Sequence, residues 1–212
     1  MTINETMISQ DNSDSLFHMV KASGVVLAPD GHFNKPFDSE KSDNEILHHV
    51  INYYHTTLKN TPTALKLLQQ MAIDKGDVID HFKLGFSDRT FGNLLPEKNR
   101  KEGAALRGRL QRLGILKPSG HELFRGSLVV PVIENGMVKQ IYGYKLSKKL
   151  RPGTPVHTYL SDSSCGFFNH KAVQTCEELI MCSSIIDVLT FWCAGYKNVT
   201  CSYAKEDLHE YE

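Results

Sequence analysis

Residues 183–187 bring together three side chains that could do chemistry, Ser183, Ser184 and Asp187, between an apolar run and a helical pattern. A carboxylate in such a turn can hold a divalent metal or move a proton, whereas neutral hydroxyls are poor magnesium ligands and poor general bases. A nucleophilic Ser183 would need an activating histidine, and the sequence contains no Gly-x-Ser-x-Gly elbow. We therefore expect these three side chains to contribute little to catalysis by themselves.

Positive charge gathers between residues 97 and 125 of a chain whose formal net charge is +0. Eight basic residues against three acidic ones leave a local excess of five; the basic ones are Lys98, Arg100, Lys101, Arg107, Arg109, Arg112, Lys117 and Arg125. Such an excess suits either a solvated helix face or a footprint on phosphates. Because the whole chain is neutral, any site for a polyanion must be a local patch.

The elements that position these side chains can be read from the apolar pattern. Residues 178–203 predict a strand, a helix and a second strand, with Asp187 in the first helical turn, where a negative charge is favourable. Apolar spacing predicts a helix from Asp43, capped by Ser42 or Asp43 itself, and a second helix at 62–72 with Thr61 as its cap and Pro62 first. A third, short helix is expected at 77–82.

The middle of the chain predicts a helix followed by a β-hairpin. Leu106, Leu110 and Leu113 recur on one helical face, and the arginines between them lie outward or sideways. The runs 128–133 and 137–146 flank the turn formers 134–136, which is typical of a hairpin. The fold class is therefore α+β, with α/β character at the C-terminus: a helical N-terminal half, an antiparallel hairpin sheet and one βαβ unit.

Four stretches share residues with one known family, in the same order along the chain. They are Phe82, Leu84, Gly85 and Phe86; then Phe124, Arg125, Pro131, Gly143 and Lys145; then Tyr159 and Leu160; and last Asp187. Residues 45–204 thus resemble the catalytic core of bacterial replicative DNA primases, and especially the primase-like proteins of plasmids and other mobile elements. Residues 177–203 are similar to the opening of the family's TOPRIM domain, where a strand ends in Glu-Gly-x-x-Asp.

The chain also departs from the family pattern. Ser183 stands in place of the Glu and Ser184 in place of the Gly, while Ser127 and Tyr144 replace an Arg and a Gly in the hairpin. No counterpart of the family's Asp-x-Asp strand can be placed before Glu212, and the usual zinc ribbon is absent from the sequence. The resemblance therefore implies a core that is truncated within its TOPRIM domain.

The resemblance implies that the family's carboxylates hold Mg²⁺ for primer synthesis, which is a phosphoryl transfer. Here Ser183 is neutral and only Asp187 is kept. We therefore expect no catalytic residue, no metal ligand and no cofactor in this chain, so that its status as an enzyme stays open.

Template binding rests on other residues. The family's basic residues on the hairpin are matched by Arg125 and Lys145, and we expect stacking of bases on Tyr144 and phosphate contacts from the arginine-bearing helix. The predicted nucleic-acid-binding residues are Arg125, Lys145, Tyr144, Arg107, Arg109 and Arg112. The implied partner is a single-stranded DNA template, joined by a replication helicase or a second primase chain.

Three regions are predicted: a flexible arm at 1–42, an N-terminal primase subdomain at 43–175 and a partial TOPRIM domain at 176–212. Hydrophobic content of 41% and the lack of a long apolar run or signal peptide predict a cytoplasmic chain with no membrane partner. The five cysteines are expected to be small buried or half-buried residues rather than disulfides or zinc ligands. A partial TOPRIM sheet should leave its second strand with an open edge.

These observations leave three hypotheses about function. The first is a degenerate primase-like protein that binds single-stranded nucleic acid without making primers. The second is an active primase fragment completed by carboxylates of another chain, and the third is a non-catalytic interaction protein that mimics a primase.

Overall fold

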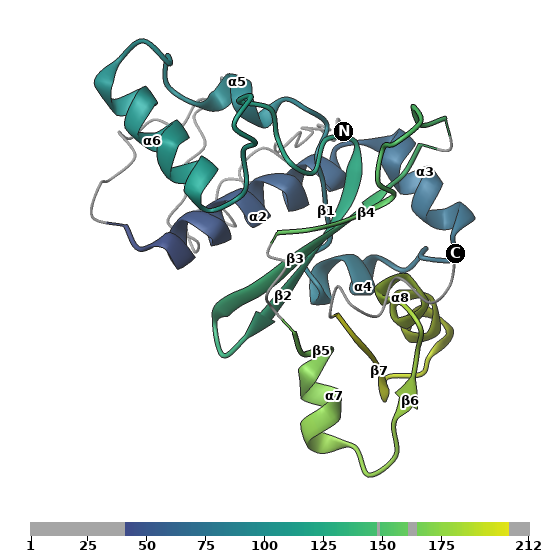
Figure 1. Cartoon of the computed structure of the whole chain (residues 1–212). Helices are drawn as coiled ribbons and strands as arrows, with labels where there is room; N and C mark the ends of the chain where they lie inside the picture. Colours follow the sequence, from purple (N-terminus) through teal and green to yellow (C-terminus); the bar gives the residue numbers. More distant parts are fainter. Residues whose placement is uncertain (1–40, 148, 161–164, 204–212) are drawn as a thin grey trace, which may run out of the picture. The chain divides into compact units, whose positions relative to one another are not determined.

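The structure is a computed structural model that describes residues 41–147, 149–160 and 165–203 (Figure 1). The predicted arm at 1–42 lies almost wholly outside these residues. The helices are α2 (Asp43–Lys59), α3 (Pro62–Gln70), α4 (Gly76–His81), α5 (Phe91–Leu94), α6 (Lys101–Arg112), α7 (His170–Thr175) and α8 (Ile185–Ala194). The strands are β1 (Gly85–Phe86), β2 (Ser127–Glu134), β3 (Met137–Lys145), β4 (His157–Tyr159), β5 (Phe167–Phe168), β6 (Ile180–Met181) and β7 (Val199–Ser202).

The two longest N-terminal helices begin where the sequence indicates. Ser42 caps α2 in a capping box with Glu45, because each residue's side chain satisfies the other's backbone N–H. Pro62 opens α3, as expected. Thr61 occupies the N-cap position of α3, as predicted, but its side chain makes no capping hydrogen bond: its hydroxyl instead donates to the carbonyl of Thr57 at 2.6 Å, one turn back in α2.

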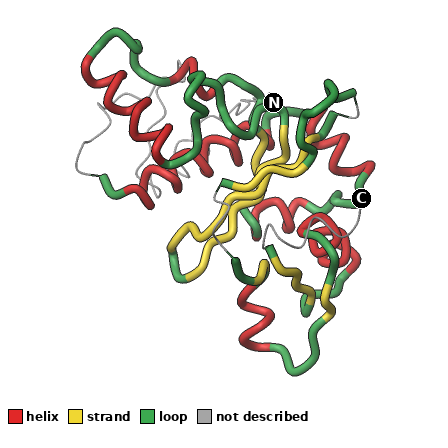
Figure 2. The backbone as a smooth tube through the Cα atoms, in the orientation of Figure 1, coloured by secondary structure: helices red, strands yellow, loops and turns green. Residues whose placement is uncertain are grey.

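The hairpin of β2 and β3 is confirmed, and it forms the centre of an antiparallel sheet in the order β1-β2-β3-β4 (Figure 2). Its turn residues Asn135 and Gly136 both have positive φ angles, 51° and 75°, which matches the twist of a two-residue hairpin. One face of this sheet packs against α2, so closely that Gly85 on β1 lies directly against Tyr54. The other face carries Leu128, Val130 and Tyr142 into the main apolar core.

That core joins the hairpin to helices from both ends of the described chain. α3, α4 and α8 all contribute buried side chains to it, among them Leu68, Val78, Val188 and Leu189. Successive residues of β2 point to opposite faces of the sheet, and nearly all of them are buried. The hairpin is therefore covered by apolar contacts on both faces. None of the described helices is long and apolar enough to cross a membrane.

The predicted strand, helix and strand at 178–203 are β6, α8 and β7. β6 and β7 pair in parallel, and Gly195 ends α8 in a left-handed conformation with φ of 110°. The expectation of an open edge on β7 was wrong, because β5 pairs with it in antiparallel register and gives the order β5-β7-β6. The edges of this sheet, within the described chain, are β5 and β6.

The cysteines are all free thiols: Cys193 and Cys201 are buried, Cys176 and Cys182 are half-buried, and Cys165 is exposed. Burial raises the pKa of the Cys201 thiol to about 12, which makes it unreactive. Across the described ranges no three His, Cys, Asp or Glu side chains come together as a metal site.

Candidate nucleic-acid interface

Lys145, at the end of β3, lies at the centre of a group of positive charges. Its ammonium group donates a hydrogen bond to the carbonyl of Arg125. The pKa of Lys145 is lowered from its ordinary value, first by burial and then by the positive charges of Lys117, Arg89 and Arg125. We call these four residues the basic cluster. The predicted pair of Arg125 and Lys145 is therefore brought together, with two further cations beside it.

Arg89 is a member of the basic cluster that sequence reasoning missed. It follows β1 with a φ angle of 79°, and its guanidinium lies over Gly126, where an added Cβ would be 3.5 Å from Nη2. A left-handed arginine is uncommon, and no motif in the sequence marks it. The structure gives Arg89, Lys117 and Arg125 no side-chain partner among the residues that it describes. Their charges are thus available to an outside anion.

The three arginines of α6 differ from one another. Arg107 donates from Nη2 to the carbonyls of Gly92 and Pro96 at 3.2 and 3.3 Å, which ties α6 to α5 and to the loop that follows it. Arg109 pairs with Asp43 at 2.7 Å and donates to the carbonyl of Lys41, so it joins α6 to the start of α2. Arg112 is exposed and makes no contact of this kind with a described residue. Of the three, only Arg112 keeps its guanidinium for a ligand.

Tyr144 lies on the opposite face of the sheet from Lys145, because neighbouring residues in a strand alternate. It belongs to an aromatic group with Tyr142, His157 and Tyr159; the ring centroids of Tyr144 and His157 are 5.5 Å apart. Tyr144 and Lys145 nevertheless both line one cavity of about 350 Å³, together with Met71, which directly follows α3. The predicted stacking residue and the predicted phosphate-binding Lys145 therefore start from different faces of the sheet but border the same cavity.

A hydrogen bond joins two members of this aromatic group, Tyr142 and His157. Burial raises the pKa of Tyr142, so its hydroxyl stays protonated, and this hydroxyl is hydrogen-bonded to Nδ1 of His157 at 2.8 Å. Burial lowers the pKa of His157, which keeps this imidazole neutral and able to accept. Neither residue carries a charge at neutral pH, so this face offers rings rather than cations.

The Ser183–Asp187 turn is a closed hydrogen-bonded unit. Ser184 caps α8 by accepting from the N–H of Asp187 at 3.1 Å, and the Asp187 carboxylate accepts from the hydroxyls of Ser183 and Ser184 at 3.0 and 2.8 Å. Mg²⁺ prefers several oxygen ligands that include carboxylates. Two hydroxyls and one carboxylate whose Oδ2 already accepts two hydrogen bonds do not fit that ion. Asp187 serves the helix terminus.

Comparison with family models and with curated proteins gives no match, whereas solved structures do match. The Aquifex aeolicus primase (zinc-binding and RNA polymerase domains) aligns with 89% of this chain and 47% of its own, at 20% identity and a TM-score of 0.60. The DnaG primase catalytic domain bound to single-stranded DNA aligns with 77% and 56%, at 18% identity and 0.60.

The Escherichia coli primase catalytic core aligns with 76% of this chain and 55% of its own, at 17% identity and 0.59. The chain has the fold of the DnaG catalytic core. It spans about half the length of the solved DnaG structures that it matches. At these identities the likeness concerns the fold, so the DnaG architecture explains how the elements are arranged while the chemistry has to be argued from this chain's own residues.

Proposed function

We propose that this chain is a DnaG-like protein that binds single-stranded nucleic acid through the basic cluster and does not make primers by itself. The observation that carries the proposal is the convergence of Arg89, Lys117 and Arg125 on the half-buried Lys145. Like charges held this close repel one another, and phosphates at their side relieve that repulsion. The cluster thus favours a polyanion over a neutral ligand.

The solved relatives support this choice of ligand. One DnaG catalytic domain is bound to single-stranded DNA, and a Mycobacterium tuberculosis DnaG RNA polymerase domain is in complex with double-stranded DNA that has a 6-nucleotide overhang. This chain shares their fold. Four cations contacting a single strand predict a slope of about −3 for log affinity against log salt.

The same chain is proposed to be inactive in synthesis because of the Ser183–Asp187 turn. Phosphoryl transfer at a two-metal site needs carboxylates that hold both ions. The turn offers one carboxylate, and both serine hydroxyls use it as an acceptor. The proposal therefore gives the chain template binding and no cofactor.

Fluorescence anisotropy with a labelled single-stranded oligonucleotide tests the proposal. The variant with Arg125→Ala and Lys145→Ala should bind more weakly and reduce the magnitude of the salt slope by about 0.7 for each lost contact. The control variant, Lys66→Ala with Lys75→Ala, removes the same charge from exposed positions on α3 and before α4 and should bind as the parent does. Thermal unfolding of each variant checks that the fold is kept.

Four results would count against this proposal. Binding that is insensitive to salt, or equal loss in both double variants, would remove the basic cluster from the interface. Absent oligonucleotide affinity together with capture of a protein partner would favour the interaction protein. Metal-dependent incorporation of ribonucleotides after a second chain is added would instead favour a primase completed in trans.

A further inference from the structure

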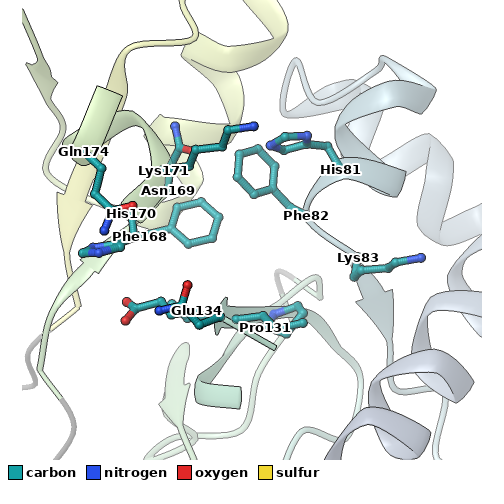
Figure 3. A pocket seen from close by; sticks show the side chains of 13 residues that line it. His81, Phe82, Lys83, Pro131, Glu134, Phe168, Asn169, His170, Lys171 and Gln174 are labelled. Atoms are coloured by element: carbon teal, nitrogen blue, oxygen red, sulfur yellow. The ribbon is translucent and has the colours of Figure 1, made fainter. Parts of the chain in front are cut away.

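A second cavity, of about 310 Å³, lies away from the basic cluster. Three segments line it: residues 81–83 at the end of α4, residues 131–135 of β2 and its turn, and residues 168–174 of β5 and α7 (Figure 3). Its inner wall is apolar, since it is lined by Phe82 and Phe168, whose ring centroids are 4.8 Å apart, and by Pro131. The volume lies at the lower end of the range for ligand pockets, which suits a small molecule.

Basic side chains gather at one end of this cavity. Figure 3 shows Lys171 extending toward His81 above the two phenylalanine rings, while Lys83 extends away from them. The pKa of His81 is lowered, first by burial and then by the positive charges of Lys197 and Lys171, against the opposing charge of Asp77. Among the described residues that line the cavity, Glu134 is the acidic one, and it comes from the hairpin side. Charge and apolar surface are thus separated within one pocket.

We propose that this cavity binds a small phosphorylated ligand of the mononucleotide class. The phosphate lies between Lys171 and His81, and the flat or apolar part of the ligand lies against Phe82, Phe168 and Pro131. The exposed amides of Asn135 and Gln174 line the same cavity and can bond to the edge of a base. This site is separate from the surface proposed for single-stranded nucleic acid, and neither depends on the other.

Ligand binding in this cavity can be followed by the fluorescence of Trp192, the single tryptophan of the chain. The His81 ring is stacked on the Trp192 indole with centroids 5.0 Å apart, and the ammonium group of Lys197 lies 2.8 Å from the indole centroid on a cation–π contact. A phosphate beside His81 favours its protonated form, and a charged imidazole next to the indole changes its emission. Ligand binding should therefore alter the fluorescence of Trp192.

In the experiment the full chain is titrated separately with ADP, pyrophosphate and adenosine while the emission of Trp192 is recorded. The same titration of free tryptophan amide corrects the emission for light absorbed by the ligand. ADP should give a saturable change, pyrophosphate a weaker one and adenosine none. Lys171→Ala should weaken ADP binding about tenfold, as expected for loss of a charge-assisted contact. Lys83→Ala is the matched control, since it removes a cation of the same cavity that extends away, and should keep the parent affinity.

Three outcomes overturn the proposal: no saturation by ADP, equal binding of adenosine, or no difference between Lys171→Ala and Lys83→Ala. Competition with ADP by an oligonucleotide that carries a 5′ phosphate, but not by one that lacks it, would show that the pocket binds the end of a nucleic acid. That result would reject the free nucleotide as the ligand. The double variant at Arg125 and Lys145 should still bind ADP. The test of ADP binding in the cavity is therefore independent of the test of oligonucleotide binding at the basic cluster.

Discussion

Ser183 and Ser184 show how two identical side chains acquire different roles from their positions. Both hydroxyls donate to the Asp187 carboxylate, but only Ser184 also accepts from the N–H of Asp187 and so caps α8. Ser183 is exposed. An N-cap satisfies a backbone donor that has no partner inside its helix, whereas an exposed hydroxyl exchanges one hydrogen bond for another with water.

Ser184→Ala should therefore destabilise the protein by about 1 kcal/mol, the usual effect of losing a serine cap. Ser183→Ala should change the free energy of unfolding by less than about 0.5 kcal/mol. Urea unfolding followed by circular dichroism measures both. Equal effects of the two substitutions would show that the cap does not hold α8.

At the scale of elements, glycine allows α2 to pack closely on the sheet. A Cβ on Gly85 would lie 2.6 Å from Tyr54 Cβ and 2.8 Å from its carbonyl carbon, and backbone cannot move aside as a flexible side-chain end can. The same pattern recurs where Gly143 on β3 lies against the buried ring of Phe124. Two glycines thus set the distance between the hairpin sheet and the elements that cover this face.

Gly85→Ala should destabilise the protein by about 1–3 kcal/mol, the usual cost of overpacking a core. Gly92→Ala in α5 is the control, since nothing lies within 4 Å of its added Cβ, and it should be neutral or slightly stabilising. Denaturant midpoints of the two variants give the comparison. An unchanged midpoint for Gly85→Ala would mean that α2 can shift without loss.

At the scale of the whole molecule, histidines with lowered pKa values couple stability to pH. Partial desolvation by the surrounding protein is the first cause of a lowered pKa at His49, His81 and His157, each with an ordinary value of 6.5. Below that value the unfolded chain binds protons that the folded chain resists, so the unfolded state gains stability as pH falls. The stabilisation is complete above pH 6.5 and declines below it.

The urea midpoint should therefore be lower at pH 5.5 than at pH 7.5, a direction fixed by these lowered pKa values. His157→Gln should reduce the difference, because the Gln amide can still form a hydrogen bond with the Tyr142 hydroxyl and does not titrate in this range. A midpoint that is equal at both pH values would contradict the lowered pKa values of these imidazoles.

The sequence predicts the fold better than it predicts the candidate site. Local rules suffice for Pro62 and for the Asn135-Gly136 turn, since each depends on a residue's own backbone preference. The roles of Arg107 and Arg109 depend on the carbonyls of Gly92 and Lys41, which only the tertiary structure brings near. Pairing of β5 with β7 was missed for the same reason.

The sharing of one core by early and late elements has a consequence for synthesis on the ribosome. The face of the hairpin that carries Leu128, Val130 and Tyr142 is completed by Val188 and Leu189 of α8, which are made about fifty residues later. A nascent chain that has released the hairpin but not α8 therefore leaves part of this apolar face uncovered, because α3 and α4 are already made but α8 is not. Since chains emerge N-terminus first, this is the stage at which misfolding, aggregation and chaperone binding compete with folding.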